Sequence, residues 1–166
     1  MSGTQSGTRQ RRSGNHVLLL DENLCSLDIA VTLRQLRGWS IELHSDHFEP
    51  GADDVSVVTL CGERGWALVT CDDMRYAPET RAAIVRHRVR IFKLTIGRET
   101  HGVMMASMLV IAQDKIIDLL RKNRTAFCAH ILRNGTVQIR TRFEDDKGFT
   151  DSQRRTFRKY GTFDGS

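Results

Sequence analysis

The stretch Val17-Leu18-Leu19-Leu20-Asp21-Glu22-Asn23 decides the fold class. Four consecutive apolar residues end abruptly in two acids and an amide. A short apolar run without polar alternation is typical of a strand that is covered on both faces, as in a parallel sheet. The stretch therefore predicts a central parallel strand that ends at Asp21.

Outward from this strand, helix and strand patterns alternate along the chain. Between Gly51 and Gly65, a helix is expected to begin at Asp53 and Asp54, where acids suit its positive end. Alternation of this kind predicts an α/β protein with a mainly parallel sheet and helices on both faces. The other expected elements are a helix capped by Ser26 and ended by Gly38, strands at 41–43, 66–70 and 89–94, and helices at 79–87 and 102–122.

The end of the domain follows a different pattern. Residues 127–132 and 136–140 flank Asn134-Gly135, the dipeptide favoured by a two-residue type I′ hairpin turn. An antiparallel hairpin is therefore expected to complete the domain. The expected boundaries are a disordered basic leader at 1–15, a folded domain at 16–140 and a charged, flexible tail at 141–166.

Charge and composition limit the function classes. The chain has 166 residues and a formal net charge of +5, and the excess of basic residues lies in the two end segments. Basic arms of this kind attract phosphate backbones or acidic proteins, and solubility alone explains them equally well. No apolar stretch has the length of a membrane span, and no signal peptide is recognisable, so a cytoplasmic protein without a membrane partner is expected. The four cysteines form no CxxC pair, which argues against a zinc knuckle or a disulfide framework.

Acidic residues stand at the ends of two predicted strands and at the start of one helix. Asp21 with Glu22 follows the first strand, Asp72 with Asp73 follows the third, and Asp54 opens the helix before that third strand. Parallel sheets bind ligands at the carboxyl ends of their strands, where these acids are expected to meet. Carboxylate oxygens select a hard ion, Mg²⁺ or Mn²⁺. Taken singly, each acid also has an ordinary interpretation as a helix cap, a turn residue or a solvent-exposed side chain.

Four blocks of sequence carry a resemblance to a known family. These blocks are LLLDENL (18–24), PGADDVSVV (50–58), WALVTCDD (66–73) and RYAPETRAAIVRHRVRIFKL (75–94). In their order and spacing, the chain resembles the PIN-like ribonucleases over about residues 17–140, especially the VapC-type toxins of toxin-antitoxin pairs. The resemblance implies a three-layer α/β/α sandwich, Mg²⁺- or Mn²⁺-dependent cleavage of RNA, and an antitoxin protein as partner.

The resemblance also implies site residues. It assigns the catalytic metal to Asp21, Asp54 and Asp72. Relatives often carry a further Glu just after the helix-start aspartate, where this chain has Val55 and Ser56. Asp73 either replaces that missing acid or is an exposed turn residue, and Glu22 is a further candidate ligand.

Basic side chains after the third strand are candidates for binding RNA phosphates. Arg75 and Arg81 are the two predicted contacts, although a solvated helix face is an alternative for arginines in this segment. The methionines at 104, 105 and 108 on the long helix belong either to the core or to the surface of a homodimer.

Two other functions remain open at this stage. A phosphoryl-accepting receiver domain also has acids after its first and third strands, but it needs a hydroxyl and a lysine on two different later strands. Here Lys93 and Thr95 fall on one predicted strand. The incomplete acid set leaves a second alternative, a PIN-like module that binds RNA or a protein without cutting.

Overall fold

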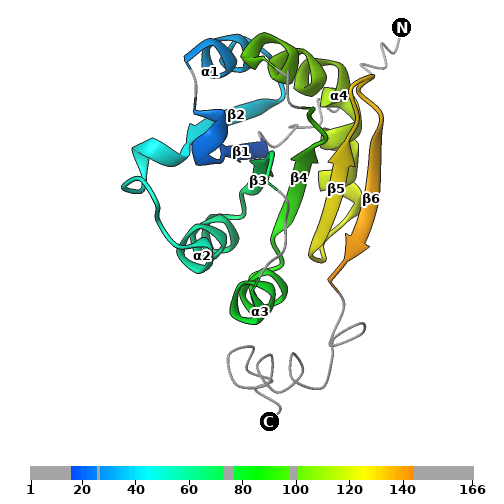
Figure 1. Cartoon of the computed structure of the whole chain (residues 1–166). Coiled ribbons are helices and arrows are strands. Elements are labelled where there is room, and N and C mark those ends of the chain that lie inside the picture. Colours follow the sequence, from blue (N-terminus) through cyan, green and yellow to red (C-terminus); the bar gives the residue numbers. More distant parts are fainter. Residues whose placement is uncertain (1–15, 26, 73–76, 98–100, 144–166) are drawn as a thin grey trace, which may run out of the picture.

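The computed structural model describes residues 16–25, 27–72, 77–97 and 101–143, and these residues form the expected α/β architecture (Figure 1). Six strands make one sheet in the order β2-β1-β3-β4-β5-β6. The first five strands are parallel and β6 is antiparallel to β5. The strands are β1 (His16–Leu20), β2 (Trp39–Leu43), β3 (Ala67–Thr70), β4 (Arg90–Leu94), β5 (Phe127–Ile131) and β6 (Val137–Arg142).

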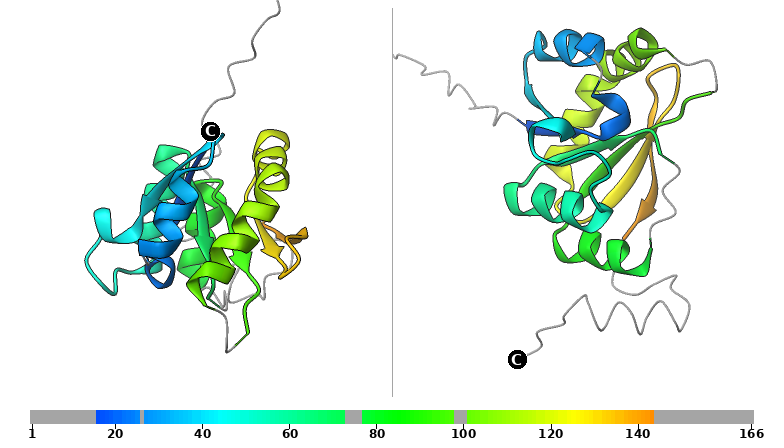
Figure 2. Two further views of the ribbon diagram at one scale, coloured as in Figure 1. Left: turned by 90° about the horizontal axis from the view of Figure 1, so that it is seen from above. Right: turned by 60° about the vertical axis from the view of Figure 1, so that its left-hand side comes forward.

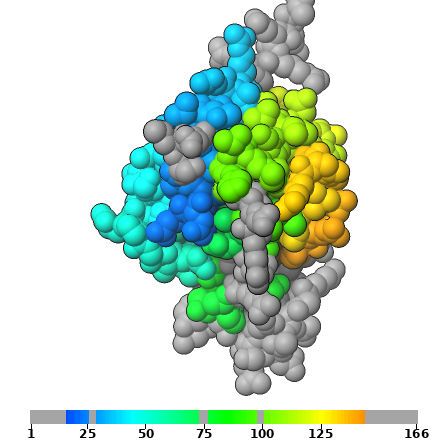
Figure 3. All heavy atoms as spheres, turned by 45° about the horizontal axis from the view of Figure 1, so that its top comes forward, coloured from blue at the N-terminus to red at the C-terminus, as the bar shows by residue number. Residues whose placement is uncertain are grey.

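Helices cover both faces of this sheet. They are α1 (Leu27–Arg34), α2 (Asp54–Arg64), α3 (Pro78–Arg86) and α4 (Gly102–Lys122), with 3-10 turns η1 (Glu22–Leu24) and η2 (His44–Asp46). Helices α1 and α4 pack together on one face, and α2 and α3 pack together on the other (Figures 1 and 2). Figure 3 shows α4 at the surface between α1 and the β5–β6 hairpin. This arrangement is the predicted three-layer sandwich.

The sheet is buried on both sides, as the apolar run of β1 predicts. Leu18, Leu19 and Leu20 are all fully buried. Leu18 and Leu20 pack in the core under α1 and α4, whereas Leu19 packs in the core under α2 and α3. The alternation of side chains along a strand divides the run between the two cores. Asp21, the next residue, therefore lies just past the carboxyl end of β1.

The hairpin between β5 and β6 has a different turn from the one expected. Among the non-glycine residues described, only Arg88 has a positive φ, so Asn134 lacks the left-handed conformation that a type I′ turn requires. Gly135 has φ +78° and its N–H donates to the Leu132 carbonyl, while the Leu132 N–H donates to the Thr136 carbonyl. The prediction of a two-residue turn was therefore wrong, and the hairpin has a three-residue loop with glycine at the left-handed position.

Two element ends also differ from expectation. Helix α1 ends at Arg34, because the Leu33 carbonyl accepts a hydrogen bond from the Trp39 indole at 3.1 Å and the chain turns at Gly38, with φ +99°. Strand β6 continues to Arg142, two residues past the expected boundary. Phe143 is buried beyond it, which keeps this end of the strand on the core.

Several expectations concern residues outside this description, namely the leader at 1–15, the helix cap at Ser26 and nearly all of the tail at 141–166. Within the described ranges, no helix combines the length and the apolar character needed to cross a bilayer. The four cysteines are free thiols, with Cys61 and Cys128 buried in the core.

Candidate functional site

Asp21 lies at the carboxyl end of β1, where hydrogen bonds of its backbone and its carboxylate hold it. Its N–H donates to the Val69 carbonyl of β3 at 2.9 Å. One carboxylate oxygen, Oδ1, accepts from the Glu22 N–H at 2.9 Å and so caps the 3-10 turn η1. The other oxygen, Oδ2, accepts from the Thr70 hydroxyl at 2.8 Å. The carboxylate is therefore fixed between β1 and β3.

Asp72 lies beside Asp21, because β1 and β3 are neighbours and both end here. The Asp72 N–H donates to the Thr70 hydroxyl oxygen at 3.1 Å, so one threonine holds both acids. The Asn23 amide donates to Asp72 Oδ1 at 3.0 Å. The charge of Asp21 is among the causes that raise the pKa of Asp72, as expected for two neighbouring carboxyl groups. The chain thus brings together two of the three predicted catalytic aspartates.

The third, Asp54, is the first residue of α2. Asp53 before it is the helix cap, with its carboxylate accepting from the Ser56 N–H at 2.9 Å and the Ser56 hydroxyl at 2.6 Å. These bonds hold the pKa of Asp53 below its usual value. Capping therefore occupies Asp53 and leaves Asp54 as the acid of this pair that faces the others.

The pKa values of Asp54 and Asp72 are both raised. For Asp54 the largest cause is burial, followed by the charges of Asp21 and Asp53. For Asp72 the largest cause is again burial, followed by the interaction with Asp21, and the charge of Asp54 acts in the same direction. Converging carboxylates disfavour their own ionisation unless a cation neutralises them. Asp21, Asp54 and Asp72 therefore influence one another's ionisation.

The site lies where the strand order changes direction. Strand β1 leads to β2 on one side, whereas the chain crosses to β3 on the other side. In an open parallel sheet the crevice at this switch point is the usual ligand site. Figure 1 shows β1 beside β3, with α2 below them.

The site offers few protein side chains that could coordinate a metal ion. No three acidic, histidine or cysteine side chains of the described residues lie close enough together to form a complete metal centre. Thr70 bonds to both Asp21 and Asp72, and Asp54 influences the pKa of Asp72. Mg²⁺ is commonly bound by one or two carboxylates, with water and substrate phosphate completing its octahedron. The donor set fits Mg²⁺ or Mn²⁺ in that manner.

The remaining predicted site residues have different positions. The exposed Glu22 carboxylate accepts from the Gly51 N–H at 3.2 Å, so it ties the end of β1 to the loop that leads into α2. Asp73 and Arg75 lie outside the described residues. The Arg81 guanidinium stands 5.7 Å from the centre of the Phe143 ring. Metal binding by Glu22 and Asp73 and phosphate binding by Arg75 and Arg81 stay predictions.

Sequence reasoning missed three residues that the fold places at the site. They are Thr70 and Asn23, through the hydrogen bonds described above, and Lys93 of β4, which is in register with Thr70. Thr70 is almost fully buried at 3% exposure although it is polar. A hydroxyl that ends an otherwise apolar strand, two residues before an aspartate, is the signal that would have identified it.

Thr70→Val is expected to weaken the site more than the fold. Valine keeps the volume but removes the hydroxyl that donates to Asp21 and accepts from Asp72. Outer hydrogen-bonding partners of metal ligands typically contribute about 10–100-fold in affinity or activity. We expect a loss of that size in Mn²⁺ affinity, measured by titration calorimetry. Thr70→Ser is the matched control and should retain near wild-type affinity; equal affinity in Thr70→Val and wild type would contradict the positioning role.

Comparison with known proteins agrees with this geometry. Residues 17–95 match a family model described as "PIN like domain", a segment that contains β1 to β4 and all three catalytic candidates. No curated protein and no solved structure matches the chain. The matched segment includes the crevice between β1 and β3, so the resemblance and the acidic site coincide.

Proposed function

We propose that this protein is a Mg²⁺- or Mn²⁺-dependent endoribonuclease that hydrolyses RNA phosphodiesters. PIN-like domains are commonly nucleases, and the match to that family supports a hydrolase acting on nucleic acid. The observation that carries the proposal is the mutual electrostatic influence of Asp21, Asp54 and Asp72 at the carboxyl edge of the sheet. Without a cation, the repulsion among these carboxylates costs free energy.

The chain's own residues supply the positioning that such chemistry needs. Asp21 and Asp72 are the proposed first ligands, with Asp54 as the third carboxylate. Thr70 and Asn23 hold the first two in place. Bound there, Mg²⁺ or Mn²⁺ supplies an acidified water and a counter-charge for the scissile phosphate. A protein nucleophile is not required.

A positive charge also lies near the acids. Lys93 is partly buried and in register with Thr70, and it influences the pKa of Cys71, the residue between Thr70 and Asp72. We propose Lys93 as a contact for a substrate phosphate, in addition to Arg75 and Arg81. A lysine provides a point charge that suits this role.

One assay separates the proposed nuclease from the two alternatives. The full chain is incubated in Mg²⁺ with single-stranded RNA and, separately, with a small phosphodonor such as acetyl phosphate. We expect RNA fragments and no phosphoryl adduct on the protein, measured by gel electrophoresis and intact mass. A phosphoryl group on Asp72 would instead assign a receiver. RNA retention without fragments would assign a binding module, with Val55 and Ser56 as the reason that the acid set is incomplete.

The toxin role is a further part of the proposal and rests on the resemblance to VapC-type toxins. It implies an antitoxin protein as partner and a cytoplasmic site of action. Induction of the wild-type chain in a bacterium is expected to arrest growth, because cleaved RNA stops translation, whereas induction of Asp72→Asn should not. Growth curves at matched expression levels measure the difference. Equal growth of the two strains would separate the nuclease activity from any toxin role.

A further inference from the structure

A pocket separate from the acidic site lies at the amino ends of the parallel strands, whereas the acids lie at their carboxyl ends. Its volume is about 340 Å³, and it is formed where β3, β4 and β5 begin. Trp66, His87, Arg88, Arg90 and Arg124 contribute to its lining. The acids stand at the other ends of these parallel strands, which are four or five residues long, so the two sites are roughly 15 Å apart.

Positive charge dominates this pocket. Three arginines line it, and no acid does so among the described residues. Arg90 is fixed by a 2.8 Å hydrogen bond from Nη2 to the Gly65 carbonyl. The pKa of Arg90 is lowered, mainly by burial and then by the charge of Arg124. The pKa of the neighbouring His16 is also lowered, mainly by burial and then by the charges of the surrounding arginines, Arg121, Arg90 and Arg124. The cations therefore repel one another, and an anion would relieve that repulsion.

The backbone at Arg88 gives an independent reason to assign its side chain a role. Helix α2 ends with Gly65 in the left-handed conformation, where its N–H donates to the Gly62 carbonyl and the Trp66 N–H donates to the Cys61 carbonyl. This pair of hydrogen bonds is the Schellman motif, in which glycine is the preferred residue because it has no Cβ.

Helix α3 ends in the same motif beside the same pocket. The Arg88 N–H donates to the Val85 carbonyl and the Val89 N–H donates to the Ile84 carbonyl. Arg88 has φ +52° and occupies the position that corresponds to Gly65 of α2. An arginine here costs backbone strain that glycine would avoid. The chain therefore keeps a conformationally unfavourable residue that lines the pocket.

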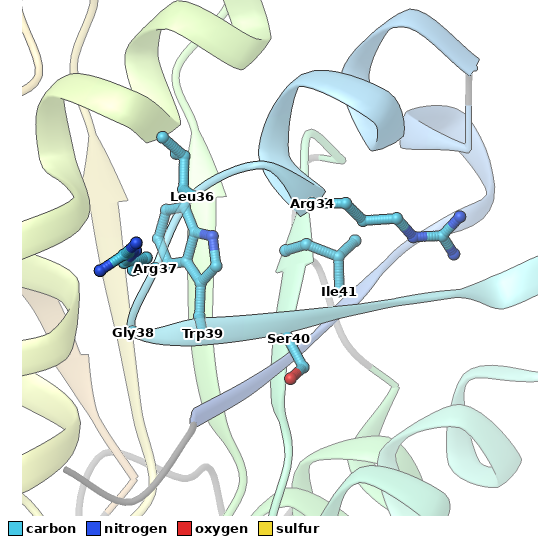
Figure 4. Close-up of a pocket in the computed structure, with 7 residues that line it drawn as sticks. All are labelled: Arg34, Leu36, Arg37, Gly38, Trp39, Ser40 and Ile41. Atoms are coloured by element: carbon cyan, nitrogen blue, oxygen red, sulfur yellow. The ribbon is translucent and has the colours of Figure 1, made fainter.

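Another pocket, larger than this one, does not bring its arginines together. It has a volume of about 490 Å³ and lies at the start of β2, with Arg34 and Arg37 in its lining. Figure 4 shows these two guanidinium groups pointing in opposite directions from the pocket, with Trp39 between them. Arg34 also lies 3.8 Å from the Asp46 carboxylate. A single anion cannot engage both arginines there.

We propose that the pocket formed by Arg88, Arg90 and Arg124, the arginine pocket, binds a phosphate group. Guanidinium groups present planar pairs of N–H donors that match phosphate oxygens. The phosphate belongs either to RNA or to a small phosphorylated ligand. This site is separate from the acidic edge and does not depend on the proposed nuclease activity.

The test uses the full chain in EDTA, so that the acidic site contributes no metal-dependent binding. Inorganic pyrophosphate and a short single-stranded RNA are titrated separately by calorimetry. Arg88→Gly removes the guanidinium and places the preferred residue in the Schellman motif, so its melting temperature should equal or exceed that of the wild type. We expect its affinity for at least one probe to fall about tenfold, which corresponds to the loss of charge-assisted hydrogen bonds.

Arg37→Ser is the matched control, since it removes the same charge at an exposed position away from the arginine pocket. Its affinity should stay at the wild-type value, and Arg124→Ser should behave like Arg88→Gly. A loss confined to pyrophosphate identifies a small ligand, and a loss confined to RNA identifies the nucleic acid. Absence of binding by both probes, or equal losses in Arg88→Gly and Arg37→Ser, would overturn the proposal. A lower melting temperature for Arg88→Gly with unchanged affinities would assign the arginine a structural role instead.

Discussion

Asp21→Asn is expected to reduce RNA cleavage by at least about a hundredfold while leaving the fold equally stable or more stable. Asp21 is the residue on which the site depends, because it accepts a hydrogen bond from Thr70 and its charge raises the pKa values of Asp54 and Asp72. Asparagine retains an oxygen for the Glu22 N–H, but its amide nitrogen replaces the oxygen that accepts from the Thr70 hydroxyl. The substitution therefore removes one accepted hydrogen bond together with a charge, and relief of carboxylate repulsion is expected to offset that loss.

The pH dependence of stability provides a second measurement on the same variant. A carboxyl group whose pKa is raised in the folded state binds its proton more tightly there than in the unfolded chain. Asp54 and Asp72 therefore favour folding below their folded pKa values, and this contribution is lost as the pH rises through them toward neutrality. Because Asp21→Asn lowers both pKa values, its gain in melting temperature over the wild type, measured in EDTA, should be largest near pH 7 and should shrink on acidification.

Asp114→Asn is the control, since Asp114 is an exposed acid on α4, away from the crevice. Its cleavage rate and its melting curve should follow the wild type at each pH. An Asp21→Asn variant that cleaves RNA at the wild-type rate would exclude Asp21 from the active site. A variant that unfolds would show that the carboxylate is needed for the end of β1.

The order of apolar segments and turn signals was enough to predict the framework from sequence. The continuous apolar run at the start of the domain predicted a strand that is covered on both faces, and β1 is buried in both cores. The bounds of α4 agree with the expected helix at 102–122. Convergence of Asp21 and Asp72 followed from the parallel arrangement of β1 and β3, because adjacent parallel strands end at the same edge.

The parts that were missed depend on contacts between distant residues or on backbone dihedral angles. The hydrogen bonds that join Thr70 to Asp21 and Asn23 to Asp72 each span 49 positions in the chain, so local sequence does not identify the partners. The turn at Asn134-Gly135 was assigned from a dipeptide preference, whereas the register of β5 and β6 decides the loop length. At Arg88 the sequence shows an ordinary arginine, and only the dihedral angle distinguishes it.

Removal of divalent metal is expected to abolish RNA cleavage completely. In the part of the chain that the structure describes, the hydrogen bonds to the Asp21 and Asp72 carboxylates come from neutral Thr70, Asn23 and backbone groups. In the proposed mechanism the metal acidifies the attacking water, so EDTA should leave no residual rate. Mn²⁺ should restore the rate. Cleavage that persists in EDTA would indicate a metal-independent mechanism or a contaminating ribonuclease.

The melting temperature measures binding of the same ion without relying on RNA cleavage. A ligand that binds only the folded state stabilises it by about 2.7 kcal/mol at a hundred times its dissociation constant. Mn²⁺ should therefore raise the melting temperature of the wild type in a concentration-dependent manner, and Asp72→Asn should lose most of that rise. In the wild type the ion also cancels the repulsion among Asp21, Asp54 and Asp72, so the loss of stability between acidic and neutral pH should disappear when Mn²⁺ is present. If Mn²⁺ shifts the wild type and Asp72→Asn equally, the ion binds elsewhere and the acidic edge is not the metal site.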